Sequence, residues 1–305
     1  VVILESTTYP GTTLEIVLPI LENVSNLKAG VDFLLGYSPE RIDPGNKEWT
    51  FKNTPKIVSG INTKSLEKIS EFYKSIIDNV VEVSGTREAE MVKLIENTYR
   101  QVNIAMVNEL AILSNMLDID IWEVVEAAKT KPFGFQSFRP GPGVGGHCIP
   151  IDPKYLSFKT RQIGQPVRFV ELAQEINNSM PNYVVARISE LMNKKEILLK
   201  NSKILILGVA YKKDIGDTRE SPAIDIMESL LEKSVDLSFY DPHVDELVFN
   251  ENSIYKEENL ENLSNYDLIL IHTPHSEFHE INFESITSLI FDSTGSFEIS
   301  NAERI

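Results

Sequence analysis

Four short apolar runs alternate with helical segments in the C-terminal third of the chain. They are residues 204–210, 235–240, 267–271 and 289–291. Runs this short and this apolar are typical of strands that are buried on both faces of a parallel sheet, and strands that alternate with helices form doubly wound α/β domains. The sequence therefore predicts a small, doubly wound, Rossmann-like domain at residues 200–305.

The N-terminal region also predicts α/β structure. We expect strands at 1–4, 31–37, 56–59 and 80–83, and helices at 14–21 and 64–77. A buried strand that opens a chain indicates a larger sheet, because parallel strands need neighbours. Residues 1–84 are therefore expected to form the end of an N-terminal Rossmann-like sheet, with an exposed edge that could pair with other chains.

The middle of the chain, residues 85–199, is expected to be a central long-helix domain. Its main element runs from Thr86 to about Leu117 and would be about 48 Å long at about 1.5 Å per residue. A second long helix is expected at 168–194, with a kink or a break at Pro181. Apolar residues recur along the first helix in steps of three and four, which predicts a buried stripe. These residues are Met91, Ile95, Tyr99, Val102, Met106, Leu110, Leu113 and Leu117.

A loop at residues 138–153 holds four glycines, four prolines and the only cysteine, Cys148. Glycine and proline at this density exclude a helix or a central strand, so the backbone must be a loop of defined shape. Asp152 lies four residues after Cys148, which is compatible with a nucleophile in a pocket. Taken alone, however, the loop favours a buried thiol, because most free cysteines are small buried apolar residues.

Composition narrows the range of partners. The formal net charge of −16 repels nucleic acid and anionic membranes, and the single cysteine excludes an intrachain disulfide. No apolar run approaches the roughly 20 residues of a membrane span. We therefore expect a cytoplasmic protein that binds neither nucleic acid nor membrane. Any phosphate site must be a local basic cluster, and Lys212, Lys213 and Arg219 form one after a predicted strand, before a helix that opens at Ser221 and Pro222.

Two smaller motifs are weighed and set aside. The glycines at 141–146 resemble a dinucleotide fingerprint, but they follow no predicted strand and open no helix. The histidines at 272, 275 and 279 have a spacing that could bind zinc, yet no fourth ligand lies nearby in the sequence. We expect them to be surface histidines, and we expect no metal site.

Two motifs together are specific enough to indicate a family. Residues 143–152 read Gly-Val-Gly-Gly-His-Cys-Ile-Pro-Ile-Asp, and residues 210–222 read Ala-Tyr-Lys-Lys-Asp-Ile-Gly-Asp-Thr-Arg-Glu-Ser-Pro. With these, the chain resembles the nucleotide-sugar dehydrogenases of the UDP-glucose/GDP-mannose dehydrogenase family. Residues 5–13, residues 38–45 and His147 look most like the branch of UDP-N-acetylglucosamine 6-dehydrogenases.

The resemblance implies an NAD-dependent oxidation of the C6 alcohol of a UDP-sugar to a carboxylate. Cys148 would be the nucleophile that forms a thiohemiacetal and then a thioester. Lys93 and Asn97 would hydrogen-bond the oxygen at C6, where negative charge develops. Asp152 would position water or move protons, Thr7 would hold a water, and Glu40 would be the general base of hydrolysis.

The resemblance also implies ligand contacts and a partner. Ser6, Thr7 and Arg219 would lie near the NAD. The long helix would form a homodimer surface, as it does in the family. The UDP-sugar would be held by Arg139, Gly141, Gly143, Gly145, Tyr211 and Lys212.

Two departures from the family pattern bear on these expectations. Part of the family has a second acid where this chain has Pro44, so the role of that acid is not transferred. The family also begins with a glycine-rich turn that this sequence does not contain, so we expect a fragment that is inactive alone. UDP-glucose, UDP-N-acetylmannosamine and GDP-mannose stay open as substrates. A non-catalytic module that binds sugar nucleotides is the alternative from another class.

Overall fold

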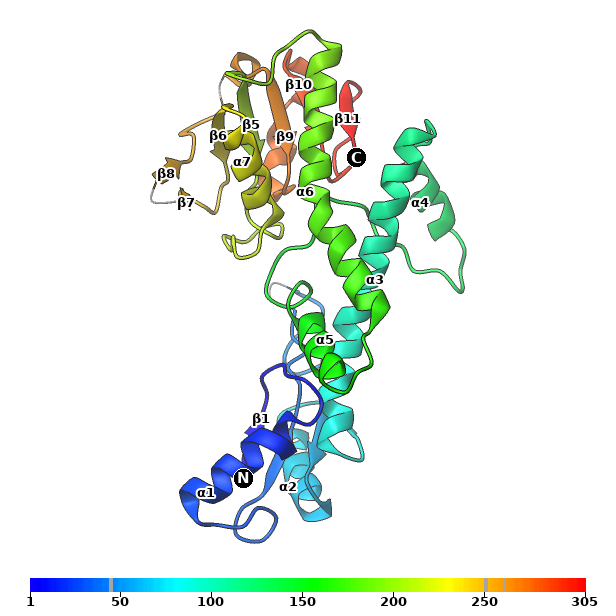
Figure 1. The fold of residues 1–305 in the computed structure, drawn as a ribbon, viewed down its shortest axis with the longest axis vertical. Coiled ribbons are helices and arrows are strands. Elements are labelled where there is room, and N and C mark those ends of the chain that lie inside the picture. Colours follow the sequence, from blue (N-terminus) through cyan, green and yellow to red (C-terminus); the bar gives the residue numbers. More distant parts are fainter. Residues whose placement is uncertain (44–45, 250–251, 261) are drawn as a thin grey trace. The chain divides into compact units, whose positions relative to one another are not determined.

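The computed structural model describes residues 1–43, 46–249, 252–260 and 262–305. The chain divides into two compact units. The first unit comprises Val1–Arg100 and Ile151–Val170, and the second comprises Gln101–Pro150 and Glu171–Ile305. Figure 1 shows that both strands and helices are present along the chain, which confirms the α/β fold class. None of the described helices is both long and apolar enough to cross a bilayer.

The first unit contains a four-stranded sheet in the order β1-β2-β3-β4. Its strands are β1 (Val2–Leu4), β2 (Leu35–Tyr37), β3 (Lys56–Gly60) and β4 (Val80–Glu82). β1 and β2 are parallel, as are β3 and β4, whereas β2 and β3 are antiparallel. β1 forms one edge of this sheet, and Val2 is 38% exposed there. The predicted second strand is shorter than 31–37, because the N–H groups of Val31, Asp32 and Phe33 all bond to the Lys28 carbonyl in a turn.

Four helical elements accompany this sheet. The π-helical turn η1 (Thr13–Val17) leads into α1 (Leu18–Ser25), so the helical segment predicted at 14–21 covers 13–25 and ends later than expected. α2 (Thr63–Lys74) is capped by the Asn62 side chain and packs Ile69 against Val58 of β3. α5 (Asp152–Gln162) packs Leu156 against Leu94.

The second unit contains a five-stranded parallel sheet in the order β11-β10-β9-β5-β6. Its strands are β5 (Lys203–Leu207), β6 (Asp236–Tyr240), β9 (Leu268–Ile271), β10 (Leu289–Asp292) and β11 (Ala302–Arg304). The four predicted strands are confirmed. β11 and the hairpin of β7 (Glu246–Phe249) and β8 (Asn252–Tyr255) were not predicted. β8 and β11 are largely polar, and β7 is an apolar segment that the prediction missed. The strand order reverses between β5 and β9, and ligands of such sheets bind at the carboxyl ends of the strands beside that point.

Alternate residues of β5 face the two sides of this sheet. Ile204 and Ile206 belong to a core shared with α6 (Arg168–Lys194) and α7 (Pro222–Glu232). Leu205 and Leu207 pack on the other side against the short 3-10 turns η2 (Leu263–Asn265), η3 (Ser276–Glu280) and η4 (Phe283–Ser285). Ser221 caps α7 and Pro222 is its first residue, as predicted.

The long helix is confirmed as α3 (Thr86–Met116), but its predicted buried stripe is wrong. The buried side of α3 is instead lined by small and polar residues, among them Asn97, Gln101, Ala105, Asn108 and Ala111. Asn108 Nδ2 donates to Asn177 Oδ1 of α6 at 3.0 Å, so the helices are joined through amides as well as through apolar contacts. Six residues of the predicted stripe are exposed. They are Ile95, Tyr99, Met106, Leu110, Leu113 and Leu117.

The remaining helices are α4 and α6, and α6 has the predicted bounds of 168–194. α4 (Ile121–Lys129) begins after Asp120, whose side chain accepts the N–H of Trp122 at 2.9 Å. α6 continues through Pro181, so the expected break is absent from this described helix. Met180 and Val184 on either side of the proline are buried in the core, which holds the helix together across the missing hydrogen bond.

Candidate functional site

The first unit brings two of the predicted catalytic residues together. Asn97 on α3 donates from Nδ2 to Oδ2 of Asp152, the first residue of α5, at 2.5 Å. Both side chains are buried, so this bond fixes the orientation of the Asn97 amide. Lys93 is half-buried one turn earlier on α3. A cation and an oriented amide one turn apart can both stabilise negative charge on an oxygen.

Glu40 lies on the turn that follows β2. Its Oε1 accepts the backbone N–H groups of Arg41 and Ile42, both at 2.7 Å, and the side chain is about half exposed. Arg41 anchors the turn by donating to Glu96 on α3 at 2.6 Å and to the Pro55 carbonyl at 2.7 Å. The next part of the predicted motif, Pro44 and Gly45, lies outside the described residues.

Ser6 and Thr7 follow β1 directly, with Ser6 exposed and Thr7 half-buried. The rest of this loop is tethered by Glu90, a fully buried residue of α3 that sequence reasoning missed. Its Oε2 accepts the N–H of Gly11 at 2.6 Å, and its Oε1 accepts the N–H and the hydroxyl of Thr13 at 2.8 and 2.7 Å. A glutamate on an otherwise buried helical position is the signal that would have revealed it.

Sequence reasoning also missed Lys56, the first residue of β3. Its side chain is only 5% exposed, and Nζ lies 2.9 Å from Glu5 Oε1 and 3.4 Å from Glu40 Oε2. Tyr73 donates its hydroxyl to the same oxygen of Glu5 at 2.6 Å. Burial alone would raise the pKa of Glu5, but the bonds from Tyr73 and Lys56 outweigh it and the pKa is lowered. A lysine that opens an apolar strand was the available signal.

Cys148 belongs to the second unit and is exposed, so the expectation of a buried thiol from the loop alone is wrong. Two hydrogen bonds hold the loop that precedes it. Gly141 donates its N–H to Asn108 Oδ1 at 2.9 Å, and Gly146 donates to the Arg219 carbonyl at 3.2 Å.

The glycines of this loop pack against the segment after β5. A Cβ atom on Gly145 would lie 2.7 Å from Tyr211 Cβ and 2.8 Å from the Glu220 carbonyl oxygen. Gly146 has a φ of +83°, and its Cβ would lie 2.6 Å from the Tyr211 ring. For Gly141, in contrast, no atom of the described residues beyond its chain neighbours lies within 4 Å of such a position. The structure therefore brings the predicted glycine loop and Tyr211 together, with packing as one reason for the glycines.

The predicted phosphate-binding cations differ in their surroundings. Arg139 pairs with Glu126 at 2.8 Å. Arg219 makes a two-pronged pair with Asp217, and its hydrogen bonds lower the pKa of that carboxyl. Both guanidinium groups are more than half exposed, and exposed pairs are weak enough to exchange for a phosphate. Lys212 is half-buried.

The carboxyl ends of β5, β6 and β9 meet around the buried Asp241. This carboxylate accepts the N–H groups of Val209 and His243, both at 2.8 Å, and contacts His275 Nε2 at 3.0 Å. Burial opposes ionisation of Asp241, but these bonds lower its pKa.

The prediction that the three histidines lie on the surface is wrong for His272 and His275, which are buried; only His279 is exposed. Asp214, His243, His275 and Glu277 offer possible metal ligands within 4.8 Å of one another. Both ring nitrogens of His275 are nevertheless engaged, since Nδ1 accepts the Asp214 N–H at 3.0 Å.

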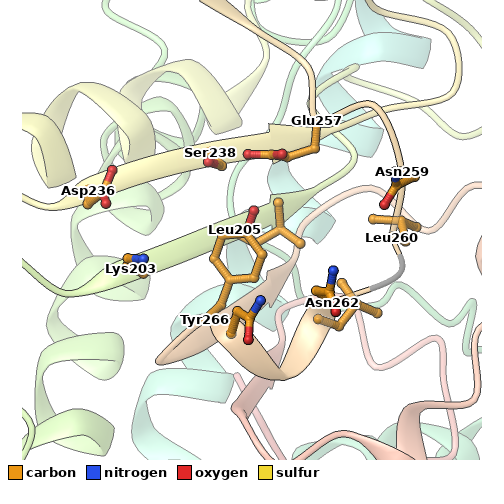
Figure 2. A pocket seen from close by; sticks show the side chains of 11 residues that line it. Lys203, Leu205, Asp236, Ser238, Glu257, Asn259, Leu260, Asn262 and Tyr266 are labelled. Atoms are coloured by element: carbon orange, nitrogen blue, oxygen red, sulfur yellow. The ribbon is translucent and has the colours of Figure 1, made fainter.

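The second unit has a polar cavity of about 400 Å³. Figure 2 shows the side chains that line it. Lys203 and Asp236 open β5 and β6, so the cavity lies at the amino ends of the strands. Ligands of parallel sheets bind at the opposite, carboxyl ends. None of the predicted site residues lines this cavity, and we do not assign it to the candidate site.

Comparison with known families matches the chain to three domains of one family. Residues 1–77 match the NAD binding domain of the UDP-glucose/GDP-mannose dehydrogenase family, residues 87–179 its central domain, and residues 205–302 its UDP binding domain.

Individual relatives carry related names. The chain is 40% identical over 288 residues to a UDP-N-acetyl-D-glucosamine 6-dehydrogenase of Salmonella typhi. The alignment covers 94% of the chain and 67% of that protein. It is 36% identical over 288 residues to a UDP-N-acetyl-D-mannosamine dehydrogenase of Methanococcus aeolicus. That alignment covers 94% of the chain and 62% of the relative. The solved structure of a UDP-D-ManNAc dehydrogenase from Pyrococcus horikoshii superimposes with a TM-score of 0.88 at 33% identity, over 100% of the chain and 71% of the other.

Proposed function

The chain belongs to the UDP-glucose/GDP-mannose dehydrogenase family, and from that membership we propose that it oxidises the C6 alcohol of a UDP-N-acetylhexosamine to a carboxylate. The observation that carries this proposal is the 40% identity over 288 residues to a UDP-N-acetyl-D-glucosamine 6-dehydrogenase. The exposed Cys148 supports it, because a nucleophile must be accessible to its substrate.

NAD is the cofactor of the family, and residues 1–77 match its NAD binding domain. Ser6 and Thr7 fit a role in holding it, because their hydroxyls follow the carboxyl end of β1 in a sheet with parallel pairing, where nucleotides bind. Arg219 is the third residue assigned to it. The bound cofactor supplies a hydride acceptor for each two-electron oxidation.

In this proposal, the Cys148 thiolate adds to the carbonyl carbon of the C6 aldehyde to give a thiohemiacetal, which becomes a thioester on oxidation. Lys93 and Asn97 donate hydrogen bonds to the oxygen at C6 as it gains negative charge. Asp152 holds the Asn97 amide through their 2.5 Å bond. Thr7 holds a water, and Glu40 accepts the proton of the water that attacks the thioester.

The UDP moiety is assigned to the second unit, whose residues 205–302 match a UDP binding domain. Tyr211 and Lys212 follow β5 next to the point where the strand order reverses, which is where such sheets bind nucleotides. The loop from Arg139 through Gly141, Gly143 and Gly145 is assigned to the same ligand, although the Gly141 N–H is itself bonded to Asn108.

We assign a homodimer to the exposed side of α3. Met106, Leu110, Leu113 and Leu117 follow one another at steps of four, three and four, and each is between 43% and 58% exposed. An apolar helical stripe of this length is costly in water and is typical of a subunit interface. Sedimentation should give the mass of two chains, and a monomer at micromolar concentration would contradict the assignment.

A panel of nucleotide sugars given with NAD to the full-length enzyme tests the function. UDP-N-acetylglucosamine should give two NADH per uronate formed. Cys148→Ser should abolish acid formation while calorimetry still detects UDP-sugar binding. Binding without turnover of any sugar by the full-length wild-type enzyme would favour the non-catalytic module instead.

UDP-N-acetylmannosamine is the second candidate substrate. It is favoured by the 36% identity to the Methanococcus enzyme and by the TM-score of 0.88 with the Pyrococcus structure. The two sugars differ only in the configuration at C2, so the ratio of kcat/KM for the two UDP-sugars decides between them.

A further inference from the structure

Lys56 is a buried cation that lies between two acids, at the end of the first unit's sheet where β1 and β2 finish and β3 begins. Its Nζ lies 2.9 Å from Glu5 and 3.4 Å from Glu40, and its side chain is 5% exposed against 49% and 47% for the acids. An ammonium group this buried is stable only when it is paired, so its position is determined by the two carboxylates.

The sheet topology explains why these three residues meet. β1 and β2 are parallel, so Glu5 and the Glu40 turn both follow the carboxyl ends of their strands, on the same side of the sheet. β2 and β3 are antiparallel with Tyr37 opposite Ser59, and continuing this register places Glu40 opposite Lys56. The first residue of β3 therefore lies beside the carboxyl ends of β1 and β2.

The hydrogen bonds on Glu40 divide between its two oxygens. Oε1 accepts the N–H groups of Arg41 and Ile42, and Oε2 faces Lys56. A carboxylate has about four lone-pair positions. Three donors therefore fix its plane while leaving a position for water, and half of the side chain is open to solvent.

We propose that Lys56 is a positioning residue that orients Glu40 for the hydrolysis of the Cys148 thioester. In that step the oxygen of water adds to the thioester carbonyl carbon while one proton passes to Glu40. The C–S bond then breaks, the thiolate leaves with the electron pair, and the acid formed loses its remaining proton to solvent. The inference rests on the proposed function, since it needs the thioester and the base role of Glu40.

The same lysine ties Glu40 to the segment that carries Ser6 and Thr7. Glu5 directly precedes this segment and is fixed by Lys56 and by the Tyr73 hydroxyl on the same oxygen. Removing the ammonium would therefore loosen both the base and the neighbouring segment. Arginine in place of lysine would keep a cation that can reach both acids.

The test compares Lys56→Met and Lys56→Arg with a control, Lys52→Met, which removes a lysine that is 75% exposed and 3.9 Å from Asp78. Lys56→Met should lower kcat by about 10–100-fold, less than the roughly 100–10,000-fold that a positioned base contributes, because Glu40 itself remains. The KM for the UDP-sugar should change little. Intact-protein mass spectrometry during turnover should show the acyl adduct on Cys148 accumulating. Lys56→Arg should recover most of kcat, and Lys52→Met should match the wild type.

A double-mutant cycle with Glu40→Gln separates positioning from general damage. If Lys56 acts through Glu40, the double variant should be no slower than Glu40→Gln alone. Additive losses, or a Lys56→Met variant with wild-type kcat and no adduct, would overturn the inference while leaving the proposed function intact. If circular dichroism shows Lys56→Met unfolded, Lys56→Gln takes its place in the cycle. The variants are made in the full-length enzyme, and a full-length wild-type enzyme that oxidises no nucleotide sugar would overturn the proposed function and this inference together.

Discussion

Glu90 shows how one residue can organise a loop near the predicted site. It is fully buried, and its two oxygens accept three hydrogen bonds from Gly11 and Thr13. Bonds of this kind replace the water that a carboxylate loses on burial. The segment that begins with Ser6 and Thr7 is thus fixed at its far end by a helix as well as by its own turn, in which Thr12 donates to the Tyr9 carbonyl.

Glu90→Gln should therefore lower the free energy of unfolding by about 1–3 kcal/mol, because the new amide NH₂ would face at least one N–H donor and leave it unsatisfied. Urea unfolding measures this change. Glu88→Gln is the matched control, since Glu88 is exposed on the same helix and should change stability by no more than about 0.5 kcal/mol. Equal stabilities for the two variants would show that the loop does not depend on the buried carboxylate.

At the scale of elements, the glycine loop and the segment after β5 form one packed layer in the second unit. Gly145 and Gly146 contact Tyr211, and Gly146 also bonds to the Arg219 carbonyl. Residues assigned to UDP binding thus come from two segments that support each other. A substitution in the loop should therefore shift the positions of Tyr211 and Lys212.

Gly145→Ala and Gly141→Ala test this coupling as a matched pair. The new Cβ at 145 would lie 2.8 Å from a backbone oxygen and must displace one of the two segments. The Cβ at 141 would meet no atom within 4 Å among the described residues other than its chain neighbours. Calorimetry with UDP alone should show Gly145→Ala weakened by about tenfold or more, equivalent to about 1.4 kcal/mol, and Gly141→Ala close to the wild type. Equal affinities would separate the loop packing from nucleotide binding.

The elements that sequence could predict are those with a strong local signal. β5 and β9 are continuous apolar runs, and α7 has a serine cap followed by proline, so their positions follow from local chemistry. α3 was predicted to within a residue, but its buried side was not, because helical periodicity cannot distinguish a core contact from an apolar surface. Amides such as Asn108 are buried through a partner on another helix, which local sequence does not reveal.

The candidate site divides in the same way. Glycine, cysteine and lysine motifs indicated Cys148, the 138–153 loop and Lys212 because a motif is local. The partners of Lys56 are at least 16 positions away in the sequence, and those of Glu90 at least 77 positions away. Only the fold brings these partners together. Their chemistry was visible in the sequence as charges on buried elements, but the partners were not.

For the whole molecule, acid is expected to be destabilising through a residue of the second unit's core. His272 is buried at the end of β9, and burial lowers its pKa to about 4 from the usual 6.5. Above pH 6.5 the ring is neutral in both the folded and the unfolded chain and contributes nothing to pH dependence. Between pH 6.5 and 4 the unfolded chain binds a proton at this position that the folded chain does not, so stability falls as pH falls.

From pH 7 to pH 5 this residue alone should remove about 2 kcal/mol of unfolding free energy. His272→Asn should flatten that part of the pH dependence, since its amide can still bond to Thr273 Oγ1 as His272 Nδ1 does at 2.9 Å, but cannot titrate. The quantity compared is the loss of unfolding free energy between pH 7 and pH 5 within each protein, because the smaller side chain also lowers stability at every pH. His279→Asn, at an exposed position, should keep the wild-type slope. A His272→Asn protein that loses as much stability between pH 7 and 5 as the wild type would place the acid sensitivity elsewhere in the chain.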